Sequence, residues 1–175
     1  GMIGAALSMM SRLELGTPPA SIGNDQSSNT LVTAPTDIMI FFMVMPFHTG
    51  GFGNSLVPLM LSAPDMAFTR SNNMSFSLSH TSLMFLLSGN IIGSGVGTSS
   101  TLYPPSDSII GHNSPSVDLS EMALHIAGMS AIMGAINFIV SILNMHPKES
   151  TLNFIPSSSS SVLITATLLL LSLPS

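Results

Sequence analysis

The sequence predicts an all-α membrane protein, a helix bundle with about five transmembrane helices. Only 6% of its 175 residues are charged, whereas about 25% is usual in soluble domains. The charged residues leave four long uncharged stretches (residues 38–64, 71–106, 122–147 and 150–175), and a membrane helix needs roughly 20 mostly apolar residues. The apolar runs are continuous rather than alternating, which favours helices over a membrane β-barrel.

Composition narrows the classes of protein that the chain can belong to. A net charge of −5 with three basic residues argues against binding to nucleic acid. The absence of Cys excludes disulfides and thiolate metal sites. Both ends of the sequence fall inside apolar runs, so we expect residues 1–175 to be a single membrane domain that continues beyond both ends.

The first half of the chain predicts two helices. We expect a partial helix that ends near Met10, a polar loop over residues 16–29, and a second helix over about residues 30–61. Pro46 and the pair Gly50 and Gly51 should interrupt and bend this second helix. Asp37 falls inside it, where a charge in lipid costs at least about 2.5 kcal/mol. Either Asp37 lies near the membrane surface or this position is wrongly assigned.

The second half predicts three more helices. A short polar turn over residues 65–73 precedes a helix over about residues 74–92. Residues 93–120 are rich in Gly, Ser and Pro and predict a surface loop on the same side as the loop at 16–29. The next helix covers about residues 121–145, and its small residues allow close packing in lipid. The last helix begins near Pro156 and reaches the end of the chain.

A set of linked peptides resembles one particular family. The peptides are GMIGAALSMMSRLELG, IGNDQ, MIFFMVMP, GGFGN, LVPLML, APDMAF, NNMSF, SVDLSEMALHIAG, GAINFIV, LNMHPK and SVLITATLLLLSLP. Together they cover nearly the whole chain and resemble subunit I of the cytochrome c oxidase family, the haem–copper terminal oxidases. The similarity extends from the end of helix I to most of helix V of a twelve-helix fold.

The resemblance implies a respiratory-chain oxidoreductase. Such an enzyme takes electrons from cytochrome c, reduces dioxygen to water with haem a and copper, and pumps protons across the mitochondrial inner membrane rather than a bacterial plasma membrane. The expected partners are the lipid bilayer, other oxidase subunits, and the part of subunit I that lies outside this sequence.

Some positions depart from the family pattern. The family's axial ligand to the low-spin haem is a His before the MIFFMVMP run, and Pro35 occupies that position here. Proline has no donor atom for iron, so this segment as written supplies no axial ligand. Serines stand where the family has Trp, or an apolar helix start, at Ser55, Ser77, Ser100 and residues 157–161, and the chain contains 31 Ser and no Trp.

By resemblance, Asp65 is the carboxylate that collects protons at the mouth of the family's proton path. Asn54 and Asn72 resemble amides that line this path, and Ser130 and Asn137 resemble polar residues further along it. A carboxylate facing water can exchange protons, and amides can hold a chain of water molecules. The alternatives are a helix-end Asp with turn Asn residues, and hydrogen bonds between helices for Ser130 and Asn137.

Two further residues resemble family sites. Arg12 resembles an arginine that contacts haem a, and the alternative is a cation that anchors the membrane interface. Glu14 resembles a ligand of a peripheral calcium or sodium ion, although calcium needs six or more oxygen ligands. The five His residues have no spacing typical of a metal site.

Two functions remain open from the sequence. The first is a segment of the oxidase catalytic subunit, which the intact APDMAF and GGFGN peptides favour. The second is a non-catalytic membrane scaffold, a degenerate or split oxidase fragment without its own redox centre, which Pro35 favours. A small channel would need a polar row lining a pore, and the proton path explains the polar residues better.

Overall fold

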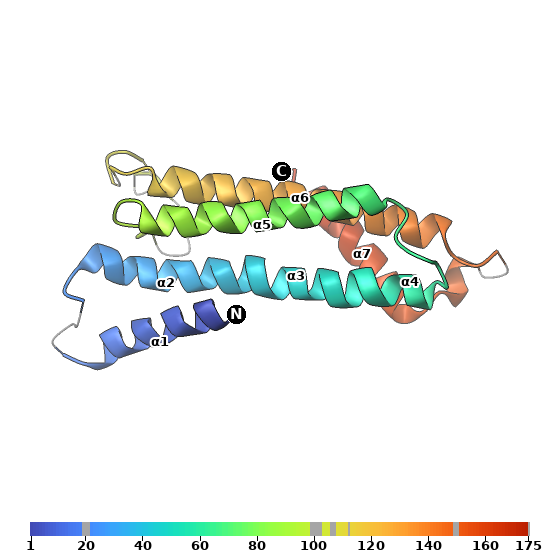
Figure 1. The fold of residues 1–175 in the computed structure, drawn as a ribbon, viewed down its shortest axis with the longest axis horizontal. Helices are drawn as coiled ribbons and strands as arrows, with labels where there is room; N and C mark the ends of the chain where they lie inside the picture. The colour runs from blue at the N-terminus through green and yellow to red at the C-terminus, as the bar shows by residue number, and fades with distance from the viewer. Residues whose placement is uncertain (19–21, 99–102, 106–107, 112, 149–150, 175) are drawn as a thin grey trace. The chain divides into compact units, whose positions relative to one another are not determined.

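A computed structural model of the protein describes residues 1–18, 22–98, 103–105, 108–111, 113–148 and 151–174. Pro19, Ser100, Asp107 and His112 therefore lie outside the described residues. Within these ranges the chain is helical without any β-strand, which confirms the predicted class (Figure 1). There are five helices in the described parts: α1 (Met2–Gly16), a long helix (Asp25–Met60), α5 (Thr69–Ile91), α6 (Ser116–Asn144) and α7 (Ser157–Ser172), with a single 3-10 turn at Leu152–Phe154.

The long helix changes its hydrogen-bonding register along its length. It consists of α2 (Asp25–Met39), the π-helical segment η1 (Ile40–Val44), α3 (Met45–Phe47), the π-helical segment η2 (His48–Leu56) and α4 (Val57–Met60). The predicted interruption at Pro46, Gly50 and Gly51 therefore takes the form of widened π turns, and the helix does not break there. Such turns accommodate residues that cannot complete the regular i to i−4 ladder.

Several predicted helix boundaries were wrong by about one turn or more. α1 continues past Met10 to Gly16, and the long helix begins at Asp25 rather than near residue 30. The Asn24 side chain caps this earlier start by accepting a hydrogen bond of 3.0 Å from the Gln26 N–H. α5 begins at Thr69 and α6 at Ser116, so the predicted polar stretches 65–73 and 93–120 both end in helix. Polar residues in the first turn of a helix explain these errors.

The chain divides into two compact units. The first contains Gly1–Val44 and Thr81–His125. Its core consists of Ala34, Ile38, Leu86 and Ala123, with Leu7, Phe42, Phe85 and Leu87 packed against them. The start of α2 contacts the segment after α5, because Gln26 Nε2 donates to the Gly95 carbonyl at 3.3 Å. Thr30 Oγ1 also lies 3.3 Å from the Ser94 carbonyl, although its nearer acceptor is the Gln26 carbonyl at 2.9 Å. These contacts place the segment after α5 beside the start of α2. This is the arrangement expected if the loops predicted at residues 16–29 and 93–120 lie on the same side.

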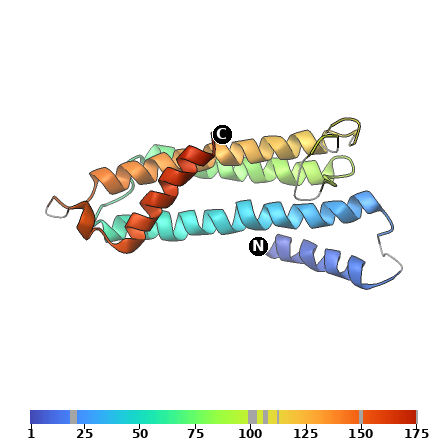
Figure 2. The same ribbon diagram turned by 180° about the vertical axis from the view of Figure 1, so that it is seen from behind.

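The second unit contains Met45–His80 and Ile126–Ser175. α7 packs against α4, and Figures 1 and 2 show this from opposite sides. One core cluster comprises Val57, Leu61, Ile142 and Ile155, and a second comprises Met66, Ala135, Phe138 and Ala166. All five residues assigned to the proton path belong to this unit.

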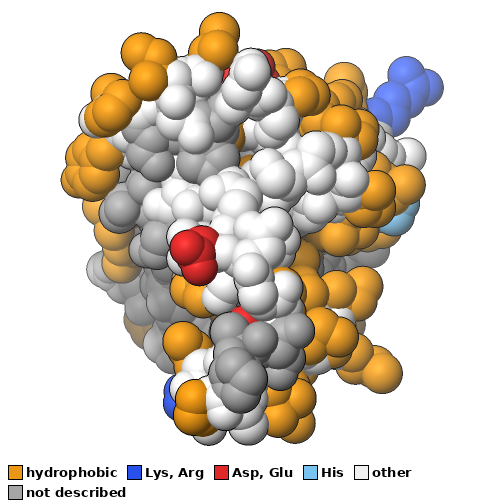
Figure 3. Space-filling model, turned by 90° about the vertical axis from the view of Figure 1, so that its left-hand side faces the viewer, with side chains coloured by type: hydrophobic (Ala, Val, Ile, Leu, Met, Phe, Trp, Pro, Cys, Tyr) orange, Lys and Arg blue, Asp and Glu red, His pale blue; other side chains and the backbone are white. Residues whose placement is uncertain are grey.

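Within the described residues, two helices are long and apolar enough to cross a membrane, namely Asp25–Met60 and Ser116–Asn144. α5 has 23 residues, but its serines and asparagines lower its hydropathy, and α7 is an apolar helix of 16 residues. Asp37 is half-buried within the long helix. Charged side chains are sparse among hydrophobic and uncharged ones on the face shown in Figure 3.

Many hydroxyl side chains in these helices bond to a carbonyl of their own helix. Ser77 Oγ donates to the Asn73 carbonyl at 3.0 Å, and Thr165 Oγ1 donates to the Ser161 carbonyl at 2.8 Å. Ser55 Oγ, in the π-helical segment, donates to the Gly50 carbonyl at 3.1 Å. A hydroxyl that is bonded in this way needs no partner from water or from another helix, which explains how apolar helices contain so many serines.

Candidate functional site

Asp65 lies in an exposed loop between α4 and α5. α4 ends with a Schellman motif, in which the Ala63 N–H donates to the Pro58 carbonyl at 2.9 Å and the Ser62 N–H donates to the Leu59 carbonyl at 3.3 Å. Ser62 has a φ of 56° at the position that usually holds Gly. This reversal sends the chain into the loop, where Asp65 is exposed and its Oδ1 accepts a hydrogen bond of 2.7 Å from the Met66 N–H.

Asn137, on α6, binds the backbone of this loop with both atoms of its amide. Oδ1 accepts from the Phe68 N–H at 3.0 Å, and Nδ2 donates to the Phe68 carbonyl at 3.2 Å. Asn137 is only 2% exposed, so the amide orientation is fixed by a buried pair of bonds. Asn72 lies one turn into α5, and its N–H bonds to the same Phe68 carbonyl at 3.0 Å.

Ser130 forms a second contact between α5 and α6. Ser130 Oγ donates to the Ser75 carbonyl at 2.6 Å, and Ser75 Oγ donates to the Ser130 carbonyl at 2.8 Å. Gly134 lies beside this contact, where a Cβ would be 3.4 Å from Ser75 Oγ, an ordinary van der Waals distance. The structure therefore gives Ser130 hydrogen bonds between two helices, the alternative to a place on a proton path, and gives Asn137 hydrogen bonds to the loop before α5. Their place on a proton path stays a prediction.

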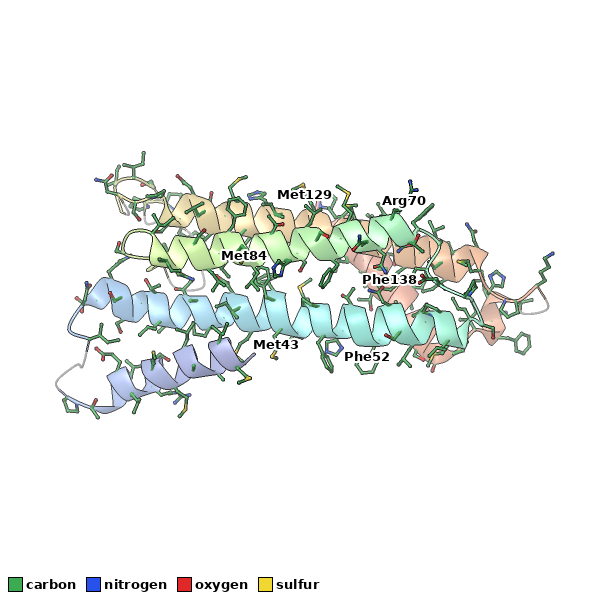
Figure 4. All side chains as sticks on the ribbon, viewed as in Figure 1. Met43, Phe52, Arg70, Met84, Met129 and Phe138 are labelled. Atoms are coloured by element: carbon green, nitrogen blue, oxygen red, sulfur yellow. The ribbon has the colours of Figure 1, made fainter. Side chains whose placement is uncertain are left out.

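Asn54 lies in η2, one residue after a close helix contact. A Cβ at Gly53 would lie 2.4 Å from Cζ of Phe138, so the glycine backbone packs directly on that ring. In Figure 4 Phe138 lies on the opposite side of this helix from Phe52. Asn54 Oδ1 is buried and has no partner among the described protein atoms. A buried amide oxygen of this kind commonly binds an ordered water molecule.

Sequence reasoning missed Ser141, which extends the polar row on α6. Ser141 is 2% exposed, its Oγ accepts from the Ala67 N–H at 2.9 Å, and the same Oγ donates to the Asn137 carbonyl at 2.7 Å. Its position four residues after Asn137 was the available signal, because residues i and i+4 share a face of a helix. Ser130, Asn137 and Ser141 therefore form one row that faces the loop and the start of α5.

The predicted cofactor and ion residues lie in the first unit. Arg12 is exposed on α1. Both carboxylate oxygens of Glu14 accept from the Ile22 N–H, at 3.2 and 3.0 Å, so this side chain closes the loop after α1. Among the described residues, no three His, Asp or Glu side chains are grouped as metal ligands. The calcium or sodium site at Glu14 stays a prediction.

The position that the resemblance assigns to a haem ligand does not suit that role. Pro35 is buried inside α2. Its ring nitrogen belongs to the peptide bond, and the other ring atoms are carbon. Neighbouring Ala34 and Ile38 belong to the apolar core of the first unit. No atom of the Pro35 side chain can therefore donate to iron.

Two of the described helices are long and apolar enough to cross a membrane, and buried hydroxyls bond between helices, as in polytopic membrane proteins. The family model described as Cytochrome C and Quinol oxidase polypeptide I matches residues 1–175. Cytochrome c oxidase subunit 1 of Eremothecium gossypii is 46% identical over 176 residues, covering 99% of this chain and 33% of that protein. The subunit 1 of Yarrowia lipolytica is 47% identical over 175 residues, with the same coverage.

The chain belongs to the cytochrome c and quinol oxidase polypeptide I family. It spans about a third of the length of these two relatives. The predicted resemblance and the predicted all-α membrane fold are both confirmed by this match.

Proposed function

We propose that this chain is a segment of the catalytic subunit of a cytochrome c oxidase and that its second unit takes up protons for oxygen reduction. The whole protein would transfer electrons from cytochrome c to dioxygen and pump protons across the mitochondrial inner membrane. Family membership over residues 1–175 supports this activity. The remaining part of subunit I, other oxidase subunits and lipid would be its partners, and residues 1–175 would act as one membrane domain.

One observation supports the proton-uptake role above the others. Asp65 is an exposed carboxylate on a loop whose backbone is bound by two buried α6 side chains, Asn137 and Ser141. A mobile loop would spread the carboxylate over many positions, whereas an anchored loop holds it at one place on the surface. An ionisable group that faces water at the edge of a membrane protein can exchange protons with bulk solvent.

The amides would continue the path from the carboxylate. Asn54 Oδ1 is a buried acceptor without a protein partner among the described residues, so it can accept from a water molecule. Asn137 Nδ2 has a second N–H beyond the one that binds the Phe68 carbonyl. Asn72 lies nearby in the first turn of α5, where its backbone N–H binds the same carbonyl. These side chains, with Ser130, would hold and orient water and need not change their own protonation.

Haem and copper would be bound by the complete enzyme through residues outside this segment. Arg12 is the one residue here that we propose as a haem contact, and its exposed position on α1 leaves its guanidinium free to reach a partner. Pro35 does not fit an axial ligand, so any low-spin haem would take its ligand from another residue.

The test of this proposal is Asp65→Asn in the assembled enzyme, reconstituted in proteoliposomes. The substitution preserves size and most hydrogen bonding but removes the ionisable group, so we expect slower oxygen reduction and lost or uncoupled proton pumping. Asp118→Asn is the matched control, because Asp118 is an exposed carboxylate at the start of α6, in the first unit. Normal turnover and pumping by Asp65→Asn would show that Asp65 is only a helix-end residue.

Pro35 favours a second function, a non-catalytic membrane scaffold. A degenerate or split fragment of the oxidase would keep the helix contacts of the family and lose its redox centre. In this case the assembly would contain the chain but would show neither oxygen reduction nor the absorbance of a low-spin haem. Oxygen consumption and an optical spectrum of the purified assembly distinguish the two functions.

A further inference from the structure

The three backbone N–H groups that precede α5 all bind side-chain oxygens. The Met66 N–H donates to Asp65 Oδ1, the Ala67 N–H donates to Ser141 Oγ, and the Phe68 N–H donates to Asn137 Oδ1. These residues precede the first turn of α5, which begins at Thr69, so their N–H groups have no partner within that helix. In this protein a different helix, α6, supplies two of the three acceptors from residues 69 and 74 positions away in the sequence.

Ser141 has a specific place in this arrangement. Its single hydroxyl proton is donated to the Asn137 carbonyl, so an oxygen lone pair is left to accept from the Ala67 N–H. The residue is 2% exposed, so water does not replace these bonds readily. Loss of the hydroxyl would leave the Ala67 N–H without this acceptor, and a half-buried donor without a partner is costly.

The link from Ser141 to Asp65 is short. Asp65 Oδ1 bonds to the Met66 N–H, and Met66 is followed directly by Ala67, the residue that Ser141 binds. Met66 is 3% exposed and belongs to a core cluster. The Met66 N–H orients the carboxylate, and Met66 is held by the packing of its own side chain and by the bond from the following Ala67 N–H to Ser141. Asp65 itself is exposed and has no packing of its own to hold it.

We propose that Ser141 is a positioning residue that holds the loop, and with it the Asp65 carboxylate, in the orientation that collects protons. The inference rests on the proposed function of Asp65. Ser141 is buried, and its hydroxyl donates to the backbone carbonyl of Asn137. It reaches Asp65 through the Ala67 N–H, and we assign it no contact with the transferred proton. Asn137 contributes to the same anchoring through Phe68, in addition to the role proposed for its amide.

The test compares Ser141→Thr with Ser141→Val in the assembled enzyme. Both substitutions add the same volume at a buried position, so any packing defect is common to the pair, and only Thr retains the hydroxyl. Thr in a helix can donate to the carbonyl four residues earlier as Ser does. Ser161→Ala is a further control, because Ser161 is exposed on α7 and its hydroxyl bonds to the Ser158 carbonyl of its own helix.

Amide hydrogen exchange measures whether the anchor exists. Loss of one hydrogen bond of ordinary strength should speed exchange of the Ala67 N–H by about tenfold in Ser141→Val relative to Ser141→Thr. Ser161→Ala should leave that rate unchanged. Equal exchange at Ala67 in the Val and Thr variants would overturn the inference.

Proton uptake measures whether the anchor acts through Asp65. We expect Ser141→Val to slow proton uptake and Ser141→Thr to restore it, and we expect Ser141→Val to add no further loss in an Asp65→Asn background. If Asp65→Asn slows uptake but Val and Thr behave alike, the inference fails and the proposed function stands. If Asp65→Asn itself has no effect, the proposed function fails, and the positioning role fails with it.

Discussion

Gly53 offers the sharpest test of the helix packing, because two neighbouring glycines serve as controls. A Cβ at Gly53 would lie 2.4 Å from Cζ and 2.7 Å from Cε1 of Phe138, whereas a Cβ at Gly50 or Gly51 would meet nothing within 4 Å. Carbon atoms in contact are ordinarily about 3.5–4.0 Å apart. In Gly53→Ala the tip of the Phe138 ring must therefore retreat by about 1 Å.

The ring has little room for this movement. Phe138 is 7% exposed and packs with Met66, Ala135 and Ala166. Overpacking of this kind costs about 1–3 kcal/mol. Part of this cost is offset because Ala stabilises a helix by roughly 0.5–1 kcal/mol relative to Gly. The two terms combine to a loss of about 0–2.5 kcal/mol in the free energy of unfolding of Gly53→Ala, and the nearly buried ring favours the upper half of this range. Gly51→Ala should leave it unchanged or raise it by up to about 1 kcal/mol.

The assay is the SDS concentration at which half of the assembled protein unfolds in mixed micelles. The midpoint should fall for Gly53→Ala and stay level or rise for Gly50→Ala and Gly51→Ala. Adding Phe138→Leu removes the ring tip, so the double variant should lose less stability than the two single changes together. The contact between Gly53 and Phe138 would be refuted if all three Gly→Ala variants moved the midpoint in the same direction by the same amount.

Two further predictions concern Ser62 and Pro35. Ser62 has a left-handed backbone that costs a side-chain-bearing residue about 1–2 kcal/mol, so Ser62→Gly should raise the SDS midpoint, and Ser62→Val, with a branched Cβ, should lower it. A stabilising Ser62→Val would contradict the reasoning. For Pro35, an experimental structure of the complete assembly should show no iron coordinated by residue 35, and any low-spin haem should take its ligand elsewhere. An iron–side-chain bond at this position would disprove the prediction.

Fold class and family could both be predicted from the sequence, and there is a physical reason for this. Charge is excluded from lipid over lengths that a helix must cross, so the four uncharged stretches are a property that can be read along the chain. The linked peptides from GMIGAALSMM to TATLLLLSLP are equally local. The helix starts at Asp25, Thr69 and Ser116 were harder to predict, because polar residues occur both in loops and in the first turn of a helix.

Helix class, membrane character and family membership were therefore determined by the sequence alone, and the partners of the polar side chains were decided only by the tertiary structure. Asn137 shows the difference: its position on a helix face was predictable, but its bonds to Phe68 join residues 69 positions apart. Ser141 and Ala67 are 74 positions apart. Hydrogen bonds of this kind depend on how two helices approach each other. Gly53 permits one such approach, because a Cβ at this position would lie 2.4 Å from the Phe138 ring.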